Sequence, residues 1–167
     1  MTTSDEQPPS RRGPDVVDRY ERAARSLLGL TEAACESRAD FAGKAEAALR
    51  AGLAFLAANP GLASLLTVEP YATGEGELPM IHQRWLERFG ALLGDAALHE
   101  PDAFAHPDFV DPTIVAGVCG QIAGRVVAAQ AEQLELLLPD LLEFTLIFYL
   151  DPLEVRRIAR ATRSSRP

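Results

Sequence analysis

Apolar residues recur at helical spacing along most of the chain. The first stripe follows Asp15, a residue type that favours the N-cap of a helix, and consists of Val16, Tyr20, Ala23, Leu27, Leu30 and Ala34. A second stripe follows the break at 37–40 and consists of Phe41, Ala45, Ala48, Leu49, Gly52, Phe55 and Leu56. Residues spaced by three and four positions share one face of a helix, so each stripe predicts an amphipathic helix.

Prolines and their neighbours predict where several helices begin and end. Asn59 ends the second helix, Pro60 opens a short apolar helix, and Pro70 is expected to stop that helix. Pro79 falls in the first turn of a long helix that carries Trp85, and residues 99–112 form an irregular connection.

The same signals divide the second half of the chain. Asp111 and Pro112 predict the cap and first residue of a helix that runs to about Gln133. The next helix, 137–150, has Pro139 near its start, and a last short helix follows Asp151 and Pro152. No segment alternates apolar and polar residues, so we expect an all-α fold of about seven helices. We expect one folded domain over 15–163, with a disordered arm at 1–14 and a disordered tail at 164–167.

The composition, the net charge and the motifs of the chain exclude several classes of function. The chain has 167 residues, of which 47% are hydrophobic, which suits one domain with a substantial core. Its net charge of -8 argues against DNA binding, because phosphate contacts dominate affinity for nucleic acids. No catalytic triad, phosphate loop or dinucleotide fingerprint is present, so we expect neither an enzyme nor a cofactor. Without a signal peptide or a long apolar run, we expect a cytoplasmic protein that does not enter a membrane.

Metal binding is a weak alternative. The connection at 99–112 contains His99, Glu100, Asp102, His106 and Asp108. Such groups can bind a transition metal, but they lack the fixed helical spacing of a recognised site. Cys35 and Cys119 also lack a metal or redox spacing. We therefore interpret the connection as a solvated acidic loop and expect no metal site.

Three segments resemble one protein family. Residues 53–60 read LAFLAANP, residues 65–69 read LLTVE, and residues 137–144 read LLPDLLEF. With the order of the predicted helices, they resemble the C-terminal ligand-binding and dimerisation domain of the TetR (TetR/AcrR) family of transcriptional regulators, over roughly 15–160. That family begins with a helix-turn-helix domain, which does not fit into the arm at 1–14. We therefore expect a chain that lacks the DNA-reading domain and binds no operator by itself.

The resemblance implies a dimer interface. Family members pair two helices per subunit into a four-helix bundle, which corresponds here to about 111–133 and 137–150. The candidate interface residues are Ile114, Gly117, Val118, Ile122, Leu137, Leu141, Phe144, Thr145 and Phe148. The alternative is that these residues form an intramolecular core, because periodicity alone does not distinguish a core from an interface.

The resemblance also implies a pocket for a small, mostly apolar or amphipathic effector between the helices. The candidate ligand-binding residues are Phe55, Leu66, Tyr71, Trp85, Phe89, Cys119, Gln121 and Arg125. Aromatic walls with a few polar groups suit such a pocket, although aromatic residues at helical spacing also pack in cores. Gln121 and Arg125 lie one turn apart, and we hypothesise that both contact the effector. Their alternative is a surface or interface pair; an inward Arg125 would need a carboxylate or an anionic ligand.

The predicted function is therefore the effector-sensing and dimerisation domain of a TetR-type repressor, acting as a homodimer. One alternative is a stand-alone protein that binds or sequesters a small molecule. Another is an inhibitor that forms a heterodimer with a full-length regulator, which would then have one DNA-reading domain. Weak DNA binding through the C-terminal arginines is a further possibility, set against a basic last turn favoured by the helix dipole.

Overall fold

The structure, a computed structural model, describes residues 13–72, 76–98, 100–101, 103–104 and 106–164. These residues form eight α-helices and one 3-10 helix and contain no strand, which confirms the expected all-α fold. The elements in chain order are α1 Gly13–Glu36, α2 Phe41–Ala58, α3 Pro60–Thr67, α4 Glu69–Ala72, α5 Glu77–Ala97, α6 Val110–Val127, η1 Ala131–Leu137, α7 Leu138–Leu146 and α8 Pro152–Ser164.

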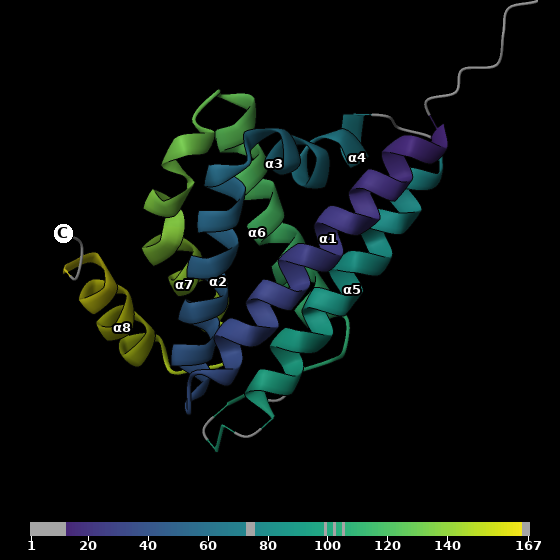
Figure 1. The fold of residues 1–167 in the computed structure, drawn as a ribbon. Helices are drawn as coiled ribbons and strands as arrows, with labels where there is room; N and C mark the ends of the chain where they lie inside the picture. The colour runs from purple at the N-terminus through teal and green to yellow at the C-terminus, as the bar shows by residue number, and fades with distance from the viewer. Residues whose placement is uncertain (1–12, 73–75, 99, 102, 105, 165–167) are drawn as a thin grey trace, which may run out of the picture.

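Helices from all parts of the chain pack against one another (Figure 1) and contribute to one main core. The long helices α1 and α5 lie side by side, and α2 packs against α1. Helix α6 packs against α5 and α3, while α7 packs against α2 and carries α8 on the edge of the molecule. The main core cluster draws residues from α1, α2, α3, α5, α6, η1 and α7. This arrangement places the interior between helices that are far apart in the sequence.

The predicted junction between α2 and α3 is confirmed. The Asp40 side chain caps α2 by accepting a hydrogen bond from the Gly43 amide at 2.7 Å. Asn59 ends α2, Pro60 is the first residue of α3, and Asn59 Nδ2 donates to the Phe55 carbonyl at 2.8 Å. The prediction for Pro70 is wrong, because α3 already ends at Thr67 and Pro70 lies in α4. A proline in the first turn of a helix removes no intrahelical hydrogen bond, so α4 accommodates it.

Two predicted helix boundaries in the second half are also wrong. Helix α6 ends at Val127 instead of about Gln133, and Ala129 has a left-handed φ of 56° that breaks the helix before η1. Helix α7 ends at Leu146 instead of Leu150. Tyr149 then packs on Phe41 with ring centroids 4.8 Å apart, so tertiary packing replaces the last predicted turn.

Asp111 differs from its predicted role as a helix cap. Helix α6 begins at Val110, and its N-cap, Phe109, makes no side-chain hydrogen bond. Asp111 lies in the first turn, and its Oδ1 accepts a hydrogen bond from the Tyr149 hydroxyl at 2.5 Å. The carboxylate thus joins the start of α6 to the turn after α7. Burial, followed by this hydrogen bond, raises the pKa of Tyr149.

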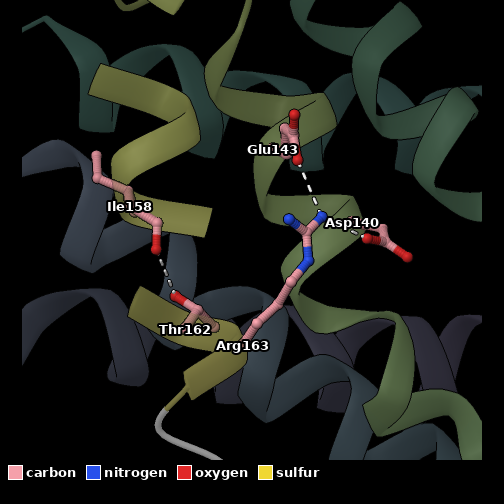
Figure 2. A network of polar contacts seen from close by, with 5 residues as sticks. All are labelled: Asp140, Glu143, Ile158, Thr162 and Arg163. Atoms are coloured by element: carbon pink, nitrogen blue, oxygen red, sulfur yellow. Dashed lines mark hydrogen bonds and ion pairs between the residues drawn. The ribbon is translucent and has the colours of Figure 1, made fainter. Parts of the chain in front are cut away.

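Helix α8 begins where Asp151 and Pro152 predict it, and Asp151 Oδ1 accepts from the Leu153 amide at 2.8 Å. At the other end, Arg163 Nη2 donates to Asp140 Oδ1 at 2.8 Å and to Glu143 Oε2 at 3.0 Å (Figure 2). Both partners lie on α7, so these ion pairs connect α8 to α7.

The domain boundaries shift slightly relative to the prediction. Gly13 and Pro14 belong to α1, and Ser164 is the last residue of α8. The remaining residues of the predicted arm and tail, 1–12 and 165–167, lie outside the described residues. Among the described residues, no single helix is long and apolar enough to cross a membrane. Helices α2 and α3 reach that length and composition only together, across a bend of 115°.

Candidate ligand-binding site

The interior contains a cavity of about 160 Å³. Its wall is formed mainly by α1, α2, α5 and α6, with two residues from the end of α3 and one from α7. Apolar side chains make up most of it, among them Ala24, Leu27, Leu49, Leu53, Leu56, Leu66, Trp85, Phe89, Leu92, Ile114, Val118 and Ile122. An apolar cavity of about 150 Å³ stays dry and binds benzene, so this volume suits a small apolar molecule.

The wall carries polar groups but no charged side chain. Its polar residues are Tyr20, Thr31, Cys35, Thr67, His82, Cys119 and Thr145, and no Asp, Glu, Lys or Arg of the described chain lines it. The Thr31 hydroxyl donates to the Leu28 carbonyl, and the Thr67 hydroxyl donates to the Ala63 carbonyl, both at 2.8 Å. The Thr145 hydroxyl oxygen is buried and has no hydrogen-bond partner.

A chain of three polar side chains connects the wall to the surface. The Tyr20 hydroxyl lies 2.7 Å from His82 Nδ1, and His82 Nε2 lies 3.0 Å from the Tyr71 hydroxyl. Tyr20 and His82 are buried and line the cavity, whereas Tyr71 is 59% exposed. The three residues come from α1, α5 and α4, so this contact ties three helices together at one side of the cavity.

Burial keeps these groups uncharged near neutral pH. It lowers the pKa of His82 and raises the pKa of Tyr20, with the nearby Cys119 and Tyr71 adding smaller upward effects on Tyr20. Burial also raises the pKa of the Cys119 thiol to about 12. Neither Tyr20 nor Cys119 ionises near pH 7, and His82 is mainly neutral. The cavity wall therefore carries polar groups but no charged group that could balance the charge of an ionic ligand.

The candidate ligand-binding residues divide into two groups. Leu66, Trp85, Phe89 and Cys119 line the cavity. The wall does not include the other four, which are Phe55, Tyr71, Gln121 and Arg125.

The contacts and exposure of these four residues explain why they do not line the cavity. Phe55 is half-buried against the main core, and Tyr71 reaches the site only through His82. Gln121 is exposed on α6. Arg125 Nη1 donates to Gln130 Oε1 at 3.0 Å, just beyond the end of α6. Neither Gln121 nor Arg125 is therefore placed to contact a molecule inside the cavity.

The candidate interface residues also divide into groups according to their positions in the fold. Four of them line the cavity, namely Ile114, Val118, Ile122 and Thr145. Leu137 and Leu141 are buried in the main core of the same chain. Gly117 faces Phe144, because a Cβ added at Gly117 would lie 2.7 Å from Phe144 Cζ. Phe148 packs edge-on against Phe144 and is 40% exposed.

Sequence reasoning missed several wall residues that carry hydrogen-bonding groups. His82, Trp85 and Phe89 share one helical face at spacings of three and four, which is the sequence signal that could have placed His82 in the site. Tyr20 belongs to the predicted stripe of α1, but nothing local in the sequence indicates its contact with His82. Thr31 and Thr67 are short polar residues inside apolar stretches. This position is the one feature of the sequence that indicates that they are buried.

The predicted acidic loop lies apart from the cavity wall. His99 and Asp102 lie outside the described residues. His106 Nδ1 is 3.5 Å from Asp111 Oδ1, and the His106 ring packs edge-on against Tyr149. Glu100 Oε2 accepts from the Phe41 amide at 3.4 Å. Among the described residues, no three His, Cys, Asp or Glu side chains gather as they would around a metal ion.

The chain was compared with models of protein families, with curated proteins and with solved structures, and none of the three comparisons finds a match.

Proposed function

We propose that this chain binds a small apolar or amphipathic molecule in the cavity between α1, α2, α5 and α6. We further propose that it serves as the effector-sensing and dimerisation domain of a TetR-type repressor. The observation that carries the proposal is the apolar, uncharged wall around about 160 Å³. Apolar pockets with a few convergent polar groups are the usual form of small-molecule sites. The sequence resemblance to the regulator family supplies the biological context.

The position of the cavity supports sensing. A ligand there contacts helices from the first, middle and later parts of the chain at once. If it fits one relative arrangement of α1, α5 and α6 better than another, binding shifts the population toward that arrangement. In a dimeric regulator, such a shift changes the separation of the two DNA-reading domains.

Ligand binding can be followed through Trp85, the only tryptophan of the chain and a residue of the cavity wall. When toluene is added, the fluorescence emission of Trp85 is expected to change and to reach a plateau at high toluene concentration. Val118→Phe fills part of the cavity and should abolish the change. Val127→Phe is the matched control, because Val127 lies on the same helix and is 72% exposed. Unchanged Trp85 emission with toluene, or equal binding by Val118→Phe, would contradict the proposed site.

The outer face of α6 supports the dimer proposal. Gly120 and Gly124 are exposed, and a Cβ added at either would meet no atom within 4 Å. A second helix can approach such positions closely, and the half-exposed Phe148 adds apolar area on α7. Gly120→Glu should convert a dimer to a monomer in analytical ultracentrifugation. Gly29→Glu, at an exposed position of α1 with equally open space, should remain dimeric. A monomeric wild-type chain would refute the self-dimer.

A stand-alone binding protein is the second candidate function. It is favoured by the fact that the apolar lining around about 160 Å³ comes from the helices of a single chain. Mixing with an intact TetR-type regulator distinguishes the two functions. Mixed dimers whose formation responds to ligand support the regulatory proposal. Ligand binding without any mixed dimer supports the stand-alone one.

A further inference from the structure

Thr145 is an exception among the threonines of the described helices. The hydroxyls of Thr31, Thr67, Thr113 and Thr162 each donate to a backbone carbonyl three or four residues earlier. This is the common way for a helical threonine to satisfy its hydroxyl. Thr145 lies in α7 with the same opportunity, yet its Oγ1 has no partner although the residue is only 3% exposed.

The position of Thr145 links this exception to the cavity. Thr145 is the only residue of α7 on the wall. Four other polar side chains of the wall are engaged within the protein: Thr31 and Thr67 bond to backbone, and Tyr20 and His82 bond to each other. Buried polar groups are almost always paired, and an exception calls for a missing partner. A buried water molecule needs two to four polar partners, and the wall is largely apolar.

The charge of the wall limits what that partner can be. No Asp, Glu, Lys or Arg of the described chain lines the cavity, and the buried His82 favours its neutral form. An ionic ligand would enter without a counter-charge, which is very costly in an apolar site. A threonine hydroxyl can both donate and accept, and a ligand hydroxyl complements both abilities.

We propose that the cavity takes an uncharged molecule of about benzene size that carries one hydroxyl group, and that Thr145 Oγ1 is the hydrogen-bond partner of that group. This inference rests on the proposed function and specifies its ligand class. The ligand ring contacts apolar side chains of the wall, and its hydroxyl distinguishes it from a plain hydrocarbon. Thr145 is thus a specificity-determining residue of the site.

The test is calorimetric titration of the full chain with benzene, phenol and benzoate near pH 7, where phenol is neutral and benzoate is charged. Wild-type protein should bind both benzene and phenol, and benzoate should bind at least tenfold more weakly than phenol. Thr145→Val should weaken phenol about fivefold, the scale of one neutral hydrogen bond, and leave benzene unchanged. Thr145→Ser, which keeps the hydroxyl, should retain the preference for phenol. Circular dichroism would establish that each variant is folded.

Thr67→Val is the matched control, because Thr67 also lines the cavity but its hydroxyl already bonds to Ala63. It should leave the ratio of phenol to benzene affinity unchanged. If Thr145→Val leaves that ratio unchanged while both compounds bind, the role of Thr145 is refuted and the proposed function stands. Benzoate binding as tight as phenol binding would refute the uncharged ligand class. If neither benzene nor phenol binds, both the proposed function and this inference fail.

Discussion

The Tyr20 hydroxyl lies 2.7 Å from His82 Nδ1, and this contact joins α1 to α5 at the wall of the cavity. The other nitrogen of the ring lies 3.0 Å from the Tyr71 hydroxyl, so both polar atoms of a buried imidazole are satisfied. The arrangement lets a histidine remain inside an apolar wall without an unpaired group. It also makes the stability of the fold depend on the protonation state of one residue.

Acidification should destabilise the protein through His82. Burial lowers the pKa of His82 in the folded state below its usual value of about 6.5. The unfolded chain therefore binds more protons in the interval between the two pKa values, and the free energy of unfolding falls as the pH drops through it. Thermal unfolding from about pH 7.5 to about pH 5.5 should show a decreasing Tm. His82→Gln should flatten that dependence, and an identical slope in wild type and variant would refute this origin.

Removing the Tyr20 hydroxyl should cost more than removing the Tyr71 hydroxyl. Tyr20→Phe leaves His82 Nδ1 buried without a partner, which typically lowers the free energy of unfolding by about 1–3 kcal/mol. Tyr71 bonds the same imidazole but is 59% exposed, so water can replace its hydroxyl. Tyr71→Phe should therefore change stability by less than about 0.5 kcal/mol. Urea denaturation of the two variants checks this difference, and equal losses would contradict it.

Gly90 should not tolerate alanine. A Cβ at Gly90 would lie 2.7 Å from the backbone nitrogen of Pro112, where α5 and α6 approach each other. Backbone cannot move aside as a flexible side chain can, so Gly90→Ala should lower the free energy of unfolding by about 1–3 kcal/mol. Gly29→Ala is the control, because its Cβ meets open space and the helix gains about 0.5–1 kcal/mol. Chemical denaturation measures the free energy of unfolding of both variants. A change in the same direction for the two would refute the close approach of α5 and α6 at Gly90.

Replacing Thr145 and replacing Thr67 by valine should have opposite effects on the free energy of unfolding in the absence of ligand. Thr145→Val removes a buried hydroxyl without a partner and should raise the free energy of unfolding by about 1 kcal/mol. Thr67→Val removes a hydroxyl that is bonded to the Ala63 carbonyl and should lower it by about 1 kcal/mol. Thermal unfolding of both variants checks the sign, and a loss of stability in Thr145→Val would mean that its hydroxyl has a partner.

Local chemistry made several boundaries predictable from the sequence. Pro60, Pro79 and Pro152 lie in the first turns of their helices, because a proline there removes no intrahelical hydrogen bond. The ends of α6 and α7 were not predictable in this way. The break after α6 depends on the left-handed conformation of Ala129, a residue that has no local preference for it. The end of α7 depends on Tyr149, which packs on Phe41 more than a hundred positions earlier in the chain.

The candidate site was predictable only in part for a related reason. Trp85 and Phe89 share a helical face, so periodicity indicated that both turn inward. Periodicity does not reveal what lies opposite a face, and Ile114 and Ile122 were therefore assigned to an interface although they line the cavity. Arg125 was expected to need a carboxylate or an anionic ligand only if it pointed inward, and it bonds to Gln130 beyond the end of α6. Whether the outer face of α6 meets a second copy stays a prediction.

The most direct test of the proposed cavity is an NMR measurement of nuclear Overhauser effects between bound benzene and assigned methyl groups of the chain. We expect cross-peaks from benzene to the methyl groups of Leu66, Ile114 and Val118, which line the cavity. We expect none to Leu98 and Leu153, which are 77% and 75% exposed. Cross-peaks confined to the exposed leucines, or no saturable binding of benzene, would contradict the central claim that this chain holds a small apolar molecule between its helices.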